Sequence, residues 1–523
     1  MTTGREKWDR RIVPKSPRKK ASTAPGEQGG KAAAVSQSTG QLELVFETAD
    51  SPQGDVSGLD VDPSTPSSRA VPKSKNKKRT ILSSMVLEEV ASIDNLRKAF
   101  RQVRRNHGAP GPDGQTVEEV EKDLAIVLPR LQKALLGETY RPGMIRRVWI
   151  PKPGSGGQRG LGIPDVIDRL AGQAVMQILS PHYEPTFHDS SHGFRPGRGC
   201  HTAIAEAQTY LEEGREWVVD LDLSKFFDRV NHQRLLARLE QRVTDTRLIR
   251  LIRLMLKAKV VLPDGVVVST EEGTPQGGPL SPLLSNIVLD ELDWELARRG
   301  HRFVRYADDA NIYVYSERSG QRVMESITRF IEGRLRLQVN QDKSAVAKPD
   351  GRHFLGFRLC RSEETGAANI HLSKRSRTRI NERIVELTPR IWGKSISDCI
   401  QAINQYITGW LSHFSVCTAS GAGEFKTLDA HIRRRLRAIQ LKQWKHKRTI
   451  VKRLIGLGVK RKTASRIYKG RKQLWALAHS SPVDRGMRNA HWANRGLVSI
   501  WEKWHVRYVE RHLDLEQLVL SLE

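Results

Sequence analysis

The spacing of apolar and polar residues divides the chain near residue 80. Residues 1–80 are rich in Ser, Pro, Gly, Lys and Thr, with one apolar island at Leu42–Phe46 and a basic cluster at Lys73–Arg79. Such a segment cannot bury enough apolar surface to offset the entropy lost on ordering. We therefore predict a disordered basic N-terminal extension over residues 1–80, in which the apolar island is a candidate docking segment.

Predicted helices and strands interleave between residues 81 and 370. Apolar residues recur at helical spacing in Ile93–Val103, and a Gly/Pro loop, HGAPGPDG, follows them. The same patterns predict a strand at Arg146–Pro151, a glycine-rich hairpin loop before the extended LGIP, a helix at Asp165–Leu179, a buried strand at Val218–Leu223, and two strands joined by a tight acidic turn in Phe303–Tyr315. The order lacks the regular period of a parallel doubly wound sheet, which indicates an α+β fold.

The chain from residue 371 onward is predicted to be helical and strongly basic. Residues 371–523 hold 31 basic and 11 acidic residues, and seven of the 11 tryptophans. Because Trp side chains are highly buried on average, we expect four of these tryptophans to pack in a core rather than to stack on bases. They are Trp475, Trp492, Trp501 and Trp504.

The charge balance indicates a polyanionic partner. The chain has 87 Lys and Arg against 58 Asp and Glu, a net charge of +29. Nucleic acid is the expected partner, with an anionic membrane surface as the alternative. No apolar run reaches the roughly 18 residues of a membrane span, and the charged N-terminus lacks the apolar stretch of a signal peptide. The four cysteines form no CxxC pair, so we expect a reducing compartment and neither a zinc site nor a disulfide framework.

Candidate chemistry resides in aspartates that stand in apolar strands. Asp308 and Asp309 lie at the turn of FVRYADDANIYVY, and Asp222 lies in WVVDLDLSKFF with Asp220 on the same strand face. A carboxylate among such neighbours needs a cation. Two acidic strands of this kind are what a two-metal site for phosphoryl transfer requires, with hard oxygen ligands for Mg²⁺. Spacing alone leaves open whether Asp220 or Asp222 takes part.

These strands belong to blocks that resemble reverse transcriptases. FVRYADDANIYV resembles that family's YxDD hairpin, here Tyr306–Asp309, and WVVDLDLSKFFDRVNH resembles the block with its first catalytic Asp, which selects Asp222. Further blocks follow the family order between about residues 90 and 360: RRVWIPKPGSGGQRGLGIPDVIDRLAGQAV, SSHGFRPGRGCHTAI, GTPQGGPLSPLLSNIVLDELD, LRLQVNQDKSAV and FLGF. The resemblance implies a right-hand polymerase with fingers and an antiparallel-sheet palm that has helices on one face.

Within this family the chain is similar to bacterial group II intron-encoded proteins. IDNLRKAFRQVRRNHGAPGPDG resembles their block before the fingers, and Ile403–Lys447 resembles their maturase segment. The lack of paired cysteines points to the IIC type, which has no endonuclease domain. The implied domains are fingers and palm at 81–370, a helical thumb and maturase domain at 371–470, and a small basic C-terminal nucleic-acid-binding region at 471–523.

The resemblance also implies catalytic and metal-binding residues. Two Mg²⁺ ions would be held by Asp222, Leu223, Asp308 and Asp309. Lys343, in NQDKSAV, would protonate the pyrophosphate leaving group or bind its phosphate. The alternative for Lys343 is a solvated loop lysine.

Four further residues would contact the incoming nucleotide by the same resemblance. Lys152 and Arg169 would bind its triphosphate, Lys as a point charge and Arg as a fork. Phe227 would pack against the sugar 2′ position and exclude ribonucleotides, and Gln276 would contact the nucleotide and order the fingers. The alternatives are two surface cations, a core aromatic and a polar loop residue.

A last set is expected to bind RNA. Arg195 and Arg198 lie in a basic Gly/Pro loop that suits a template backbone, with a simple turn as the alternative. Basic residues beside an aromatic side chain suit RNA phosphates and bases. In the helical region these are Arg433, Arg434, Arg435, Arg437, Lys445, Lys447 and Arg448.

The resulting hypothesis is an RNA-directed DNA polymerase of the bacterial cytoplasm, nucleoid-associated when on DNA. It would bind group II intron RNA, assist its splicing and copy it into target DNA during retrohoming, with a primer–template duplex and deoxynucleoside triphosphates as further partners and no membrane. Two alternatives remain: a domesticated reverse transcriptase in defence or repair, and an RNA-binding splicing cofactor without polymerase activity.

Overall fold

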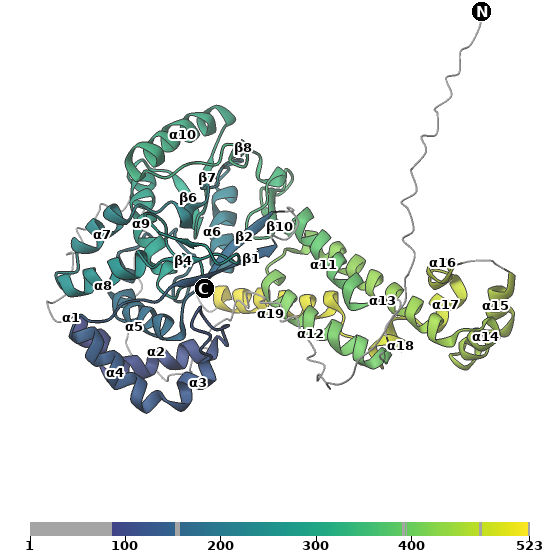
Figure 1. Cartoon of the computed structure of the whole chain (residues 1–523). Coiled ribbons are helices and arrows are strands. Elements are labelled where there is room, and N and C mark those ends of the chain that lie inside the picture. Colours follow the sequence, from purple (N-terminus) through teal and green to yellow (C-terminus); the bar gives the residue numbers. More distant parts are fainter. Residues whose placement is uncertain (1–85, 152–156, 390–392, 394, 470–472, 521–523) are drawn as a thin grey trace, which may run out of the picture. The chain divides into compact units, whose positions relative to one another are not determined.

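The structure is a computed structural model that describes residues 86–151, 157–389, 393, 395–469 and 473–520 (Figure 1). The predicted N-terminal extension, Lys152 and part of the glycine-rich hairpin loop lie outside the described residues. Within the described ranges, every helix is too short or too polar to traverse a lipid bilayer. The four cysteines are all free thiols.

Helices open the described chain. Helix α2 (Ile93–Arg105) contains the predicted helix, begins at the N-cap Ser92, and packs its apolar side on α5 (Val166–Tyr183). Helix α5 begins after Asp165, as predicted, and most of its first ten residues are buried, so it forms a central support for its neighbours. The remaining helices of this part are α1 (Val86–Ala91), α3 (Val117–Lys122) and α4 (Leu124–Leu136).

A small sheet follows, in the segment predicted as fingers. Strands β1 (Ile145–Pro151) and β2 (Gln158–Ile163) form the predicted antiparallel hairpin. Two short strands from a later part of the chain extend it, since β4 (Val260–Val261) runs parallel to β1 and β5 (Val267–Val268) pairs with β4. The sheet thus joins segments about a hundred residues apart, which fixes the hairpin to the palm segment.

The second sheet is antiparallel and has the order β6-β7-β3-β8. It contains the strand predicted at 218–223 and the two strands predicted in 303–315, so these predictions are confirmed. The strands are β3 (Trp217–Leu221), β6 (Arg302–Tyr306), β7 (Asp309–Val314) and β8 (Ala345–Ala347). Figure 1 shows β6 and β7 side by side, with α10 (Glu317–Phe330) near them.

Helices cover both faces of this sheet, so the prediction of helices on one face is wrong. Val219 and Ile312 belong to the core that holds α10 and α9 (Ser281–Arg298). Val218 and Tyr313 point the other way, into the core that holds α6 (Cys200–Glu212). The physical reason is readable in β3, because a strand with consecutive apolar residues has no solvated face.

Between these strands lie the remaining elements of the first 370 residues. Helices α7 and α8 follow β3 after a short turn of 3-10 helix. Their bounds, with those of the short turns, are η1 (Glu184–Thr186), η2 (Phe226–Asp228), α7 (His232–Glu240), α8 (Thr246–Leu256), η3 (Ile331–Leu335) and η4 (Pro349–Gly351).

The chain becomes helical after the two-stranded sheet of β9 and β10, as predicted from residue 371. The strands are β9 (Phe357–Arg361) and β10 (Ala368–Leu372). The helical elements are α11 (Lys374–Leu387), α12 (Ile396–Phe414), η5 (Ala419–Gly421), α13 (Ala422–Trp444), α14 (Lys447–Gly456), α15 (Arg461–Ala464), η6 (Ser465–Lys469), α16 (Leu474–Ala478), α17 (Ser481–Gly486), α18 (Asn489–Ala493) and α19 (Ile500–Leu520).

One hydrophobic core joins this helical region to α6 and to one face of the palm sheet. Trp492 and Trp504 are 1% and 2% exposed within it, which confirms their prediction as core residues. Trp475 and Trp501 pack against this core but are only partly buried. The residues before and after 471 share this core, so the domain boundary proposed there is not marked by a second core.

Candidate active site

Strand register brings the candidate carboxylates to one edge of the palm sheet. Leu221 of β3 pairs with Ala310 of β7, so Asp222 leaves β3 beside Asp309, the first residue of β7. Asp308 precedes it in the turn from β6. Residues that lie more than eighty positions apart in sequence therefore meet at the same strand ends.

The acidic turn has an unusual backbone conformation and packs closely against a glycine of another segment. Tyr306 pairs with Asp309, which leaves Ala307 and Asp308 at the tip. Ala307 has φ 56°, in the left-handed region that residues with a side chain rarely adopt. Gly193 lies against it, and a Cβ atom at Gly193 would stand 2.3 Å from the Ala307 nitrogen. The block SSHGF thus supports the turn by close backbone packing.

Arg305 holds the acidic turn in place through hydrogen bonds of its guanidinium. Its Nε donates to Asp293 Oδ1 at 2.7 Å, and its Nη1 donates to the Ala307 carbonyl at 2.8 Å and to Asn286 Oδ1 at 3.0 Å. Its Nη2 donates to Ser191 Oγ at 2.6 Å. Arg305 was not among the predicted site residues, although an arginine inside the apolar strand FVRY is a signal for a buried charge that needs partners.

Asp222 is held by the loop that follows η3. Lys343 Nζ lies 2.8 Å from Asp222 Oδ2, so the structure brings these two predicted catalytic residues together. The Asp222 backbone N–H donates to Ser344 Oγ at 3.0 Å, and the Asn340 N–H donates to the Asp222 carbonyl at 2.8 Å. Main chain and side chain of Asp222 are therefore both positioned by residues 340–344.

Asp220 forms an ion pair with a different residue, Arg352. Its Oδ2 accepts from Arg352 Nε at 2.8 Å and lies 2.6 Å from Arg352 Nη2. It pairs across the sheet with Asn311, further from the turn than Asp222. The geometry therefore favours Asp222 over Asp220 as the partner of the acidic turn.

The carboxylates of the turn bind protons more readily than ordinary aspartates. Loss of hydration raises the pKa of Asp308, with the charge of Asp222 adding to the rise. Loss of hydration also raises the pKa of Asp309, to about 7, together with the charges of Asp308, Asp222 and Asp220. The crowding of like charges adds to this loss of hydration and raises the pKa of Asp309 further.

This crowding fits a site for divalent cations. Among the described residues, no three His, Cys, Asp or Glu side chains already converge in the geometry of a metal cluster. Oxygen donors that repel one another are nevertheless the donor set that Mg²⁺ uses, and a cation would relieve the repulsion. Leu223, also predicted at this site, is buried and forms a bridge with Val339 directly after Asp222.

Phe227 lies in η2, five residues after Asp222. Its ring is half-buried and meets the buried Phe226 edge-on, with centroids 5.2 Å apart. Its carbonyl accepts from the Thr274 N–H at 2.6 Å. A Cβ atom at Gly273 would stand 2.9 Å from the same carbonyl oxygen, so η2 is packed closely against the segment GTPQGG.

Gln276 lies where that segment meets the fingers sheet. Its carbonyl accepts from the Gly162 N–H at 2.6 Å. Gly277 has φ 126°, and a Cβ atom there would stand 2.4 Å from the Gly162 oxygen. The glycines permit this approach, which couples β2 to the loop beside Phe227.

Arg169 is buried under the Gly/Pro loop that follows α2. Its Nη2 donates to the Ala109 carbonyl at 2.8 Å, and its buried Nε has no hydrogen-bond partner among the described residues. Burial lowers its pKa. A triphosphate could reach this guanidinium only if the loop at Gly108 moved, because that glycine lies against Arg169 Nη1. Its expected partner Lys152 lies outside the described residues.

Arg195 and Arg198 both bond within the protein. Arg195 is 7% exposed, and its Nε donates to Glu184 Oε1 at 2.8 Å while its Nη1 donates to the Ser191 carbonyl at 2.7 Å. Arg198 is partly exposed and its Nη2 donates to Asp189 Oδ1 at 2.8 Å. Arg195 therefore supports the loop beneath the acidic turn, and Arg198 is the better placed of the two for a nucleic acid.

The basic residues of α13 and the following turn also divide into arginines that bond within the protein and cations that are more exposed. Arg437 is 8% exposed, donates to the Met487 carbonyl at 2.8 Å and pairs with Asp484 at 2.7 Å. Arg435 donates to the Thr388 carbonyl at 2.7 Å. The remaining residues of the predicted set are partly or fully exposed: Arg433, Arg434, Lys445, Lys447 and Arg448.

Comparison with known proteins gives two family matches. Residues 150–359 match the model for reverse transcriptase (RNA-dependent DNA polymerase), and residues 377–455 match the model for the group II intron, maturase-specific domain. The first range holds the whole acidic edge of the palm sheet, and the second spans α11 to α14.

Two relatives carry the same likeness. Protein YkfC of Escherichia coli (strain K12) is 32% identical over 353 residues, which cover 60% of this chain and 92% of YkfC. The group II intron-encoded protein LtrA of Lactococcus lactis subsp. cremoris is 31% identical over 310 residues, 47% of this chain. The aligned part spans 50% of LtrA's length. A solved Cas6-RT-Cas1--Cas2 complex contains a chain that is 23% identical, with a TM-score of 0.32 and coverage of 47% of this chain and 26% of that one.

Proposed function

The chain belongs to the reverse transcriptase family, in the group whose members also carry a group II intron maturase-specific domain, and from this premise we propose that it copies RNA into DNA and assists the splicing of a group II intron. The reaction is attack of a primer 3′-OH on the α-phosphate of a deoxynucleoside triphosphate. The observation that supports it best is the meeting of Asp222, Asp308 and Asp309 at one edge of the palm sheet.

The three carboxylates would hold two Mg²⁺ ions, which when bound would activate the attacking oxygen and stabilise the leaving group. The protein's own part is to fix the carboxylates before the substrate arrives. Arg305 and Gly193 hold the turn, and the loop with Ser344 holds Asp222.

Lys343 would act on the leaving group of the reaction. Its side chain is 64% exposed, so the ammonium paired with Asp222 would remain open to a substrate as a proton donor. In our proposal it gives a proton to the pyrophosphate oxygen that leaves the α-phosphate, or neutralises that oxygen's charge. The half-buried Phe227 would meet the sugar 2′ position, and Gln276 would carry the contact between nucleotide and fingers.

Intron RNA would be bound by the exposed cations of the helical region. The surface lies around the end of α13 and the start of α14, within the range that matches the maturase-specific domain. We further propose target DNA and a primer–template duplex as partners. Copying of the intron into that DNA would complete retrohoming.

The test is primer extension on an RNA template by the full chain and by Asp308→Asn. The variant should lose extension by about 10²–10³-fold or more, the scale on which loss of a transition-state charge partner registers. Its affinity for a group II intron transcript, and its assistance to splicing of that transcript, should stay within a few-fold of the wild type. Asp264→Asn, the same change on the exposed β4–β5 hairpin, is the matched control and should extend normally.

Two outcomes would refute the proposal. Failure of the folded wild type to extend a primer would remove the polymerase activity. Loss of RNA binding together with extension, in a folded Asp308→Asn variant, would contradict the assignment of chemistry and RNA binding to separate surfaces.

A further inference from the structure

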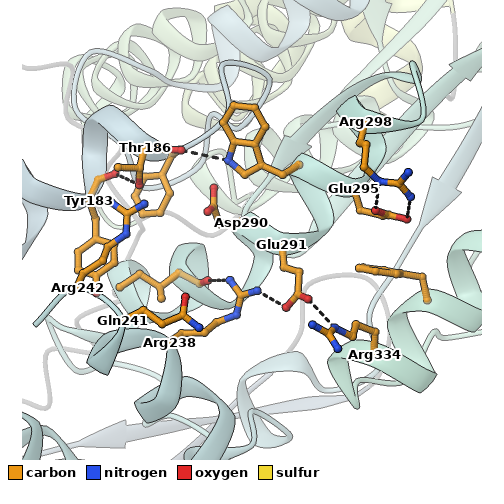
Figure 2. A pocket seen from close by; sticks show the side chains of 14 residues that line it. Tyr183, Thr186, Arg238, Gln241, Arg242, Asp290, Glu291, Glu295, Arg298 and Arg334 are labelled. Carbon is orange, nitrogen blue, oxygen red and sulfur yellow. Dashed lines mark hydrogen bonds and ion pairs between the residues drawn. The ribbon is translucent and has the colours of Figure 1, made fainter. Parts of the chain in front are cut away.

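A concave site lies among helices that pack on the palm sheet, apart from the acidic edge. A pocket of about 450 Å³ is lined by the end of α5, η1, α7, α9 and the region of α10 and η3 (Figure 2). None of the predicted catalytic or nucleotide-binding residues that the structure describes, a set without Lys152, lines it. Figure 2 shows Asp290 in the middle of the pocket, with Tyr183 and Arg242 on one side and Glu291 beside it.

Three buried polar atoms of the pocket have no hydrogen-bond partner in the part of the chain that the structure describes: Tyr183 Oη, Arg242 Nη1 and Asp290 Oδ1. Tyr183 is only 3% exposed. Buried polar groups in proteins are nearly always hydrogen-bonded, so three such atoms around one cavity mark positions that a bound molecule would satisfy. They present one donor, one acceptor and one hydroxyl that can act as either.

The other charged groups of the pocket are already paired. Glu291 Oε1 accepts from Arg334 Nε at 2.9 Å, and Arg238 bonds the other oxygen of Glu291. Arg298 Nη2 lies 2.8 Å from Glu295 Oε1. Among the described residues, the buried hydrogen-bonding capacity left for a ligand in this pocket is therefore that of the three atoms named above.

The walls suit a flat aromatic ligand. Trp294 is 49% exposed at the pocket, and its indole N–H donates to the Thr186 carbonyl at 3.2 Å, which orients the ring. The Arg242 guanidinium lies over the Tyr183 ring, 5.5 Å from its centroid. Phe187 and Phe330 complete the apolar lining. Aromatic rings and guanidinium planes are the surfaces on which unpaired RNA bases stack.

We propose that this pocket binds one unpaired guanine base of an RNA strand. The inference rests on the proposed function, in that the strand belongs to an RNA that the protein recognises. The guanine O6 would accept from Arg242 Nη1, and the N1–H and N2–H edge would donate to Asp290 Oδ1. Adenine offers an unprotonated acceptor at N1, which would face the Asp290 carboxylate and be repelled.

The exposed arginines at the rim of the pocket and the carboxyl group of Asp290 support this assignment. The side chains of Arg298 and Arg334 are 71% and 68% exposed, so they can turn toward the phosphates on either side of the base. Burial raises the pKa of Asp290 to about 7, and the nearby Asp293 adds to the rise. Two N–H donors from a base would favour the ionised carboxylate, so binding should be tested above neutral pH.

The experiment uses the full chain and unstructured heptaribonucleotides that differ only in the central base. The wild type should bind the guanosine heptamer about tenfold more tightly than the adenosine heptamer, with inosine in between, because one well-made base edge discriminates by about this factor. Asp290→Asn should bring the ratio close to one. Glu325→Gln, the same change on the exposed face of α10, should leave it unaltered.

A second variant and a crosslink test the proposal independently, in case Asp290→Asn does not fold. Trp294→Leu, at a partly exposed position, should weaken the guanosine heptamer about fivefold or more through lost stacking. A central 6-thioguanosine should photocrosslink to the α9 peptide that holds Trp294. Equal wild-type affinities for all central bases, or a crosslink confined to other elements, would overturn the proposal and leave the pocket to water or a protein side chain.

Failure of this inference can be told apart from failure of the proposed function. Asp290→Asn should extend an annealed primer at the wild-type rate, because the pocket shares no residue with the acidic edge. Absent extension in the wild type would refute the polymerase assignment, whereas normal extension without guanine preference would refute the pocket alone.

Discussion

Arg305 and Asp293 form an ion pair with side chains that are 1% and 0% exposed, and Arg305 Nη2 lies 2.5 Å from Asp293 Oδ2. The same guanidinium donates to the carbonyl of Ala307, the residue before Asp308. The position of the acidic turn therefore depends on a charge pair that is closed to solvent. A buried pair of this kind is costly to break, because removing one partner leaves the other charge without compensation.

Arg305→Met should accordingly lower the free energy of unfolding by about 3–5 kcal/mol, the usual effect of breaking a buried ion pair. The double variant Arg305→Met/Asp293→Leu should regain much of that stability, since both charges are gone. It should still extend primers poorly, because the Ala307 carbonyl has lost its donor. Denaturant unfolding and primer extension on the three proteins measure this, and full activity in the double variant would contradict the positioning role.

Phe227→Ala should admit ribonucleotides while keeping deoxynucleotide incorporation, if the ring meets the sugar 2′ position as proposed. Phe226→Ala is the matched control, because Phe226 is 2% exposed and belongs to the core. The control should lose about 3–5 kcal/mol of stability and gain no ribonucleotide incorporation. The measurement is incorporation of each nucleotide type beside a thermal melt. A stable Phe227→Ala protein with unchanged sugar discrimination would refute the gate.

The raised pKa of Asp309 predicts how stability depends on pH. Its folded pKa of about 7 exceeds the ordinary value of 3.8, so the folded chain holds this proton more tightly than the unfolded chain. Without divalent cation, this contribution to stability is complete below about pH 4 and is lost as the pH rises through about 7. Thermal melts in chelator should show the fall, Asp309→Asn should flatten it, and Mg²⁺ should stabilise more at high pH. An identical slope in Asp309→Asn would contradict the prediction.

RNA affinity should depend on the exposed cations near the α13–α14 turn. Replacing Lys445, Lys447 and Arg448 by Glu should flatten the log–log salt dependence of binding to structured RNA by about 2, at roughly 0.7–0.9 per phosphate contact. The same replacement of Arg318, Arg322 and Arg329, exposed on α10, is the matched control. An unchanged slope in the first variant, or equal flattening in both, would place the RNA contacts elsewhere.

The sequence predicted the palm strands and the acidic edge because both rest on local pattern. Consecutive apolar residues in WVVDL and FVRY fix the strands, and a carboxylate among them is conspicuous. Helices on both faces could have been inferred from the same run of apolar residues, as a strand without polar alternation is covered on both sides.

The structure changes the picture where a charge is satisfied by a partner distant in sequence. Arg195 and Arg437 were predicted to bind RNA, yet each is buried on protein acceptors. Arg169 lies under a loop sixty residues earlier in the chain. Composition shows that an arginine is present, whereas only the fold shows whether its donors are already used. The guanine pocket could not be seen in the sequence for the same reason, because its residues come from four separate stretches of the chain.

The core that unites α6, one face of the palm sheet and the helices after residue 371 has a mechanical consequence. Cys200 and His201, at the start of α6, contact His413 of α12, and Gln208 donates to the Ala368 carbonyl of β10 at 3.2 Å. Cutting the chain at residue 370 would strip apolar cover from both sides of this junction. The polymerase and splicing segments should therefore melt in one cooperative transition, and neither should be transplantable as a cassette into a relative unless its half of the shared core is exchanged with it.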